Sequence, residues 1–367
     1  MKRALGNFLL ILASIVFTLL AAEVVLRLVP LDIAGSAGGD RGYFSRFDEE
    51  LGWAPLPSVE QFHVGDGFSV AVRQNAIGLR ASEEHPFEDE TDRRRILVLG
   101  DSYVWGYGAD QEDIFTEPAA HGDDTVEMIN LGVSGYGTDQ ELLFYEKLGM
   151  QFDVDEVVLA FTTYNDILNN MFPEQYGYQK PYFTAEGELA LHDDHVEDRP
   201  ARSIGIWFRD NSRVVALAET GFLNLKHAWQ SRFGDDGPVA RPRDRVLGPG
   251  AIRPIDRQGV DLTIQLIARL RDDVEASGAE FSLVFIPYKP NVLALQPEDH
   301  PLVAAMLPGL SEAGIDCFDP YPMFVEAERD GASPFNEGDN HFNAKGHEIF
   351  GKVITDRQLR QSVSVCQ

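Results

Sequence analysis

Short, continuous apolar runs recur along the chain, and stretches with helical spacing lie between them. Each run is bounded by glycine or polar residues, which is typical of strands buried on both faces of a sheet. The runs are Ile96–Gly100, Val126–Val133, Glu156–Thr162, Phe281–Ile286 and Ile315–Phe318. Helical spacing covers Thr138–Leu148, Val260–Ala276, Leu302–Ala313 and Ala344–Ile354. Alternating strands and helices predict βαβ units and an α/β fold with a mainly parallel, five-stranded sheet covered on both faces.

The N-terminal segment has a different pattern, since Lys2 and Arg3 precede an uncharged stretch of 19 residues, Ala4–Ala22. At about 1.5 Å per residue this stretch covers close to the roughly 30 Å hydrocarbon thickness of a membrane. We therefore predict one N-terminal transmembrane helix, a signal-anchor over residues 1–30, with the rest of the chain periplasmic or extracytoplasmic. A cleaved signal peptide is the alternative, although cleavage after this stretch would put Leu20 where a small residue is needed.

The remaining chain divides by composition. Residues 31–92 are rich in Gly, Asp and Arg without a sustained period, so a stalk and an irregular edge are expected there. The main domain is predicted over residues 93–356, and 357–367 form a tail. An insertion at 171–250 breaks the alternation and is interpreted as a lid or partner surface. Within it we expect a hairpin at Lys180–Leu191, a helix around Val214–Trp229 and a loop at Gly234–Gly250.

Composition excludes several classes of protein. A hydrophobic content of 44% argues against disorder, and a net charge of −28 without a basic stripe argues against a nucleic-acid partner. The two cysteines, Cys317 and Cys366, are too few for a disulfide framework or a thiolate metal cage. Phosphate-binding and dinucleotide motifs are absent from the sequence, so we predict neither a cofactor nor a metal.

Chemically competent residues follow the predicted strands. Gly100-Asp101-Ser102 comes directly after the first strand, Gly135 and Asn165 follow the second and third, and Asp339-Asn340-His341 precedes the last helix. Ligands of parallel sheets bind beyond the carboxyl ends of the strands, so these residues are expected to meet. A hydroxyl, an imidazole, a carboxylate and N–H donors are what acyl transfer requires. Alone, the Gly-Asp-Ser triplet is more typical of a turn or a helix cap than of a catalytic serine.

Together, Gly100-Asp101-Ser102, Gly135, Asn165 and Asp339/His341 resemble the SGNH (GDSL-like) hydrolase superfamily over roughly residues 93–356, apart from the insertion. The resemblance implies a three-layer α/β/α sandwich of flavodoxin-like type. It also implies that Ser102 is the nucleophile, His341 the general base and Asp339 the residue that orients it. The implied oxyanion donors are the backbone N–H groups of Ser102 and Gly135 and the side-chain amide of Asn165.

Two departures from the SGNH pattern affect the expected function. Thr163 stands where the third sequence block usually has glycine, and Asp339 and His341 are two apart instead of three. The shorter spacing is similar to that of membrane-linked O-acetylation proteins of the alginate type. We therefore expect an esterase that acts through an acyl-serine on O-acylated carbohydrate or lipid-like esters. An O-acetyltransferase acting on a polysaccharide and a catalytically silent glycan-binding or scaffold domain are the alternatives.

Other candidate residues have simpler interpretations. His347, inside the last predicted helix, is a rival base, but a packing role is preferred. Asp339, His341 and His347 lack an evident fourth metal ligand, and the loop that contains His192 and His195 is expected to be solvated. An ordinary α/β-hydrolase is disfavoured, because Tyr136 replaces the last glycine of G-x-S-x-G. Aromatic residues near the site are interpreted as either a sugar-stacking surface or packing: Tyr103, Trp105, Tyr107, Tyr136 and Tyr164.

Overall fold

The computed structural model describes residues 2–28, 44–65, 68–89, 92–163, 165–176, 178–197, 212, 214–215 and 254–366. The chain forms two compact units. One comprises 1–43, 64–66 and 198–239 and contains helix α1 (Lys2–Leu28), while the other contains the sheet. Among the described residues, no helix is both long and apolar enough to cross a membrane. Membrane anchoring by residues 1–30 stays a prediction.

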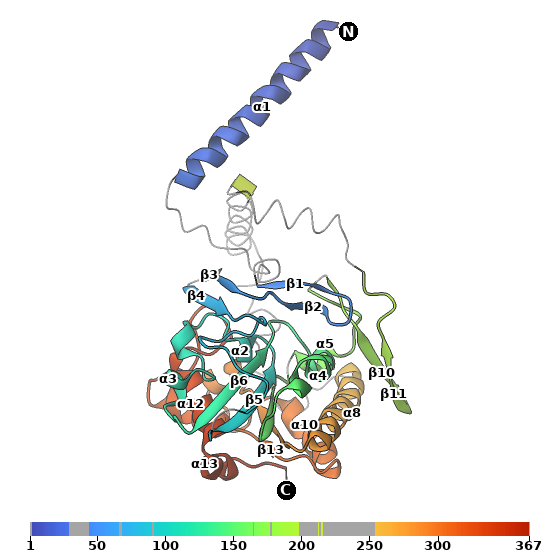
Figure 1. Ribbon diagram of the computed structural model, residues 1–367, viewed down its shortest axis with the longest axis vertical. Coiled ribbons are helices and arrows are strands. Elements are labelled where there is room, and N and C mark those ends of the chain that lie inside the picture. The colour runs from blue at the N-terminus through green and yellow to red at the C-terminus, as the bar shows by residue number, and fades with distance from the viewer. Residues whose placement is uncertain are drawn as a thin grey trace. The chain divides into compact units, whose positions relative to one another are not determined.

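A five-stranded parallel sheet forms the centre of the larger unit (Figure 1). Its order is β13-β12-β7-β5-β6, and all five strands predicted from the apolar runs are present. From β5 the chain passes to β6 on one side, and it then returns to β7 on the other side of β5. The topological switch point therefore lies between β5 and β7. The strands are β5 (Arg94–Gly100), β6 (Val126–Gly132), β7 (Glu156–Phe161), β12 (Glu280–Phe285) and β13 (Cys317–Phe318).

Helices cover both faces of the sheet, as the alternation of β5 shows. Leu97 and Leu99 join one buried cluster, and Ile96 and Val98 join another on the opposite face. The first face carries α4 (Thr138–Lys147), α8 (Pro254–Ser277) and α10 (Pro301–Glu312). The second carries α2 (Ser102–Trp105), α9 (Lys289–Leu293), α11 (Tyr321–Arg329) and α12 (Ala344–Thr355). The four helices predicted from the spacing between the apolar runs are present, and two further short helices are α3 (Pro118–His121) and α5 (Asp166–Asn169).

The irregular edge predicted within residues 31–92 is wrong for the described part of that segment. Two strand pairs form there, β1 (Ser45–Asp48) with β2 (Gly52–Pro55) and β3 (Val59–Gly65) with β4 (Phe68–Gln74). Strands of four to seven residues are too short to show a sustained period. Trp53 of β2 is buried against the main domain, so this segment belongs to the core. Residues 31–43, the first part of the segment predicted as stalk and irregular edge, lie outside the described residues.

The beginning of the insertion contains the predicted hairpin. Strands β10 (Tyr182–Glu186) and β11 (Glu188–His192) pair antiparallel around Gly187. A smaller antiparallel pair, β8 (Glu174–Gln175) with β9 (Tyr178–Gln179), precedes it. The helix expected around Val214–Trp229 and the loop at 234–250 lie outside the described residues, apart from residues 214 and 215.

The C-terminal segment is an integral part of the domain, which corrects the prediction of a tail. Helix α13 (Arg357–Ser362) is followed by a stretch that lies along β13, where Val365 N–H donates to the Cys317 carbonyl at 3.0 Å. Arg360 forms a buried ion pair with Glu156 at the start of β7. The two cysteines, which are too few for a framework, form one disulfide, Cys317–Cys366, that closes this segment onto the sheet.

Candidate active site

Ser102 lies directly after strand β5, in the first turn of α2. The Asp101 carboxylate accepts the backbone N–H of Tyr103 at 2.9 Å and so caps this helix. A side chain at Gly100 would collide with Val104, so glycine allows α2 to pack tightly against the strand. Ser102 therefore stands at the carboxyl edge of the sheet, beside the switch point where ligands bind in this topology.

His341 brings its imidazole to Ser102 from the loop before α12. Its Nε2 lies 2.8 Å from Ser102 Oγ, so these two side chains meet as the sequence predicts. Asp339 Oδ1 lies 3.3 Å from His341 Nδ1 and accepts the backbone N–H of His341 at 2.7 Å. A hydroxyl, an imidazole and a carboxylate thus lie next to one another in the spatial order that nucleophilic catalysis uses.

Asp339 is ionised beside the imidazole. Burial alone would raise the pKa of the Asp339 carboxyl, but the contact and charge of His341 and the ammonium of Lys289 lower it below its ordinary value. Lys289 Nζ also donates to the backbone carbonyls of Asn336 and Asp339, at 2.6 and 2.5 Å. This lysine, which no sequence motif marks, fixes the loop that carries both site residues.

Gly135 lies in a tight turn after β6. Tyr136 N–H donates to the Val133 carbonyl at 3.1 Å, and Gly135 has φ +81°, which favours glycine at this position of the turn. Val133 N–H donates to the Gly100 carbonyl at 3.0 Å, so the turn begins beside the strand that leads to Ser102. The backbone of this turn is therefore close to Gly100–Ser102, which we call the serine loop.

Asn165 directly precedes α5 and follows β7, the strand next to β5. Its Nδ2 donates to Asp101 Oδ2 at 2.9 Å, which joins the loop after β7 to the serine loop. Thr163, which departs from the glycine of the SGNH sequence pattern, is buried. Asp166 accepts a backbone N–H of its own loop at 2.7 Å, so this carboxyl group stabilises the loop. Tyr164 lies outside the described residues.

His347 does not face Ser102. It is buried near the rings of Phe115 and Phe342, with centroid distances of 5.8 and 5.6 Å. Burial, together with the charge of Arg80, lowers the pKa of His347 to about 3, so its ring is neutral at physiological pH. The packing role predicted for His347 is confirmed.

The two histidines of the insertion make ordinary hydrogen-bond contacts. His192 Nε2 lies 3.0 Å from Thr184 Oγ1, and His195 Nε2 lies 3.0 Å from the Lys180 carbonyl. Across the described ranges, no group of three or more His, Cys, Asp or Glu side chains is placed to hold a metal ion.

Aromatic residues of the site pack inside the domain. Tyr103, Trp105 and Tyr136 are buried, so packing accounts for these three side chains and a sugar-stacking surface does not. Tyr107 is partly exposed and stacks on the His341 ring. These four aromatic side chains therefore pack in the core or against the imidazole.

Four carboxyl groups are buried together beneath the serine loop: Asp101, Asp139, Glu141 and Asp166. Lys180, from the insertion, forms a fully buried ion pair with Asp139. Burial raises the pKa of each carboxyl, and neighbouring carboxylates raise those of Glu141 and Asp166 further. Burial thus disfavours the ionised form of all four carboxyl groups.

Arg80 is a second residue that sequence reasoning missed. Its buried guanidinium donates to the carbonyls of Trp105, Gly106 and Ala109 at 3.1, 2.5 and 2.7 Å. It thereby closes the end of α2 and holds the loop that carries Tyr107. No pattern distinguishes this arginine, because its partners are backbone groups distant in sequence.

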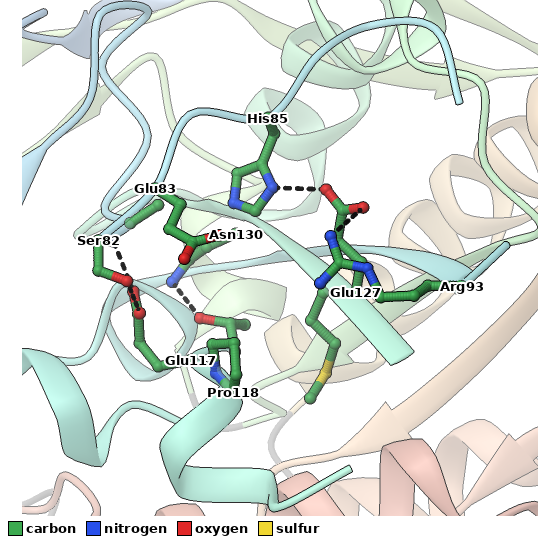
Figure 2. A pocket seen from close by; sticks show the side chains of 11 residues that line it. Ser82, Glu83, His85, Arg93, Glu117, Pro118, Glu127 and Asn130 are labelled. Carbon is green, nitrogen blue, oxygen red and sulfur yellow. Dashed lines mark hydrogen bonds and ion pairs between the residues drawn. The ribbon is translucent and has the colours of Figure 1, made fainter. Parts of the chain in front are cut away.

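A small pocket lies near the amino-terminal half of β6, at the other end of the strand from the Gly135 turn (Figure 2). The Glu127 carboxylate is part of its lining and lies 2.7 Å from His85 Nδ1, 3.2 Å from Arg93 and 3.4 Å from Arg95. The hydrogen bond from His85 and the charges of the arginines outweigh burial and lower the pKa of Glu127 to about 2. This cluster ties β5 and β6 to the segment before them.

Comparisons with known proteins give little further information. The chain matches no protein-family model and no curated protein. Among solved structures it is similar to a Bacteroides fragilis protein assigned by inference as an acylhydrolase, with 12% identity and a TM-score of 0.37. The match covers 76% of this chain and 92% of that one. At this level the similarity transfers no function.

Proposed function

We propose that this chain is a serine acyl hydrolase of SGNH type that forms an acyl-serine intermediate. The observation that carries the proposal is the 2.8 Å contact between Ser102 Oγ and His341 Nε2 at the carboxyl edge of the sheet. The ionised carboxylate of Asp339 next to the imidazole supports it, because it stabilises the imidazolium that proton transfer creates.

The proposed reaction proceeds in two halves. Ser102 Oγ attacks the ester carbonyl carbon while His341 Nε2 takes the hydroxyl proton, and the carbonyl oxygen becomes an oxyanion. The backbone N–H groups of Ser102 and Gly135 and the amide of Asn165 donate to that oxyanion. The carbonyl re-forms, the alcohol leaves with the proton from His341, and water then repeats the sequence to release the acid.

The amide of Asn165 is prepared for this role by Asp101. One Nδ2 proton is directed to the Asp101 carboxylate, which fixes the side chain and leaves the second proton for a ligand. Short esters of carbohydrate or lipid-like alcohols are the proposed substrates. The proposed location is outside the cytoplasm, with residues 1–30 as anchor, and the disulfide Cys317–Cys366 supports an oxidising compartment.

The test is hydrolysis of p-nitrophenyl acetate by the full chain. Ser102→Ala and His341→Ala should each lower kcat by at least about a thousandfold, as removal of triad residues does. His347→Gln is the matched histidine control and should keep its activity. A Ser102→Ala variant with undiminished turnover would refute the serine mechanism, and an inactive, folded wild type would favour the silent domain.

The acceptor is tested in the same assay by adding an unacetylated polysaccharide. Free acetate indicates hydrolysis, whereas acetyl groups bound to the polysaccharide indicate the O-acetyltransferase. Both activities require Ser102, because the first half of the reaction is shared. Mass spectrometry of the polysaccharide distinguishes the two products.

A further inference from the structure

The contact between Asp339 and His341 leaves the imidazole without a directed hydrogen bond. Because the two residues are two apart, Asp339 Oδ1 closes a local turn by accepting the His341 backbone N–H at 2.7 Å. His341 Nδ1 is 3.3 Å from the same oxygen, but among the described residues it has no hydrogen-bond partner. The carboxylate therefore fixes the loop and supplies charge, and the orientation of the ring needs another cause.

Tyr107 provides a surface for the ring. Its side chain stacks on the imidazole of His341 with a centroid distance of 4.3 Å and an interplanar angle of 25°. Tyr103 also contacts the imidazole, at 4.8 Å and 42°, and its hydroxyl donates to the Asn340 carbonyl at 2.6 Å. The stack with Tyr107 is the closer and more nearly parallel of the two.

Tyr107 is itself held rigidly. Its backbone N–H donates to the Ser102 carbonyl at 2.9 Å, and Arg80 binds the carbonyls of the loop around it. The rings of His63 and Phe68 pack edge-on against the phenol, at 4.6 and 5.3 Å. Ser102 begins α2 and Tyr107 follows its end, and the backbone hydrogen bond between them fixes their relative position.

We propose that Tyr107 is a positioning residue for the reaction at Ser102. Its ring holds the His341 imidazole in the orientation in which Nε2 faces Ser102 Oγ, and its π face stabilises the imidazolium formed when His341 takes the serine proton. The inference rests on the proposed function, because it assigns Tyr107 a part in that proton transfer. It accounts for how an acid two residues from its histidine suffices in this chain.

The kinetic test compares Tyr107→Leu with Tyr107→Phe in the full chain, using p-nitrophenyl acetate. Loss of the π face in Tyr107→Leu should lower kcat between about 3- and 30-fold, the range of such contacts, and leave KM unchanged. Tyr107→Phe keeps the stacking ring and should retain kcat within about twofold. The control is Tyr182→Leu, which removes another tyrosine–histidine stack, with His192 at 4.9 Å and 19°, and should not alter kcat.

A second measurement does not depend on turnover. Ring protons of His341, observed by NMR in histidine-labelled protein, should be shifted upfield by the stacked phenol in the wild type and in Tyr107→Phe, and should lose this shift in Tyr107→Leu. Full kcat in Tyr107→Leu, or a fall in Tyr107→Phe equal to that in Tyr107→Leu, overturns the inference alone. A wild type that shows the upfield shift but hydrolyses no ester overturns the proposed function, and the positioning role with it.

Discussion

The replacement Glu127→Gln should lower the free energy of unfolding of this protein and change how that free energy depends on pH. Glu127 is 5% exposed and is bound by His85, Arg93 and Arg95 at the start of β6. Glutamine keeps the shape of the side chain and removes its charge. The ionic contribution of this cluster therefore disappears, while the packing of β6 is retained.

The magnitude follows from the pKa of Glu127, which falls from an ordinary 4.5 to about 2 in the folded protein. Each pKa unit corresponds to about 1.4 kcal/mol, so ionised Glu127 contributes about 3 kcal/mol to the free energy of unfolding. Because the folded pKa is the lower one, this contribution is complete above pH 4.5 and is lost as the pH falls from 4.5 towards 2.

The assay is urea unfolding followed by tryptophan fluorescence, at a series of pH values between 7 and 2.5. The free energy of unfolding of the wild type should exceed that of Glu127→Gln by about 3 kcal/mol at pH 7, and the difference should shrink steadily below pH 4.5. Glu280→Gln is the control, because Glu280 pairs with Arg357 on the exposed surface and should contribute less than about 1 kcal/mol. A wild-type advantage that stays constant down to pH 2.5 would refute the reasoning.

Three further predictions concern packing, the disulfide and His347. A side chain at Gly132 would collide with the backbone of Trp105, so Gly132→Ala should displace α2 and lower kcat together with the thermal midpoint, measured by esterase assay and circular dichroism. Cys366→Ser opens a link across 49 residues and should lower the free energy of unfolding in urea by up to about 4 kcal/mol. The folded protein keeps His347 neutral with a pKa of about 3, so the free energy of unfolding of the wild type should decrease as the pH falls from 6.5 towards 3. The variant His347→Gln should lack this part of the decrease. An equal pH dependence of the free energy of unfolding in both proteins would contradict the prediction.

The sheet could be predicted because buried parallel strands leave a strong signal in sequence. Runs such as Ile96–Gly100 are apolar throughout, since both faces of the strand are covered. By contrast, β1 and β2 have only four residues each, which is too few for a repeat of about 2 or 3.6 residues to be recognised in the sequence. The docked C-terminal segment was missed for a similar reason: its attachment depends on single contacts, such as that of Arg360 with Glu156.

The contact between Ser102 and His341 could be predicted from topology, because residues at the carboxyl edge of one parallel sheet converge. The detailed support of the site could not be predicted. A spacing of two residues allows Asp339 to contact either the imidazole or the backbone of His341, and sequence does not choose between them. Arg80 and Lys289 bind backbone carbonyls, which every residue has, so their partners leave no trace in composition or spacing.

The return of the C-terminal segment along β13 has a consequence for handling the protein. An outer strand with free N–H and C=O groups is a template for pairing with another chain. Here Val365 N–H bonds to Cys317, Asp319 N–H bonds to the Val363 carbonyl, and Phe318 bridges Ser364, so this border of the sheet is capped by its own last residues. Trimming the chain at Ser362 would uncover that border and favour self-association, whereas an extension added beyond Cys366 leaves the cap in place.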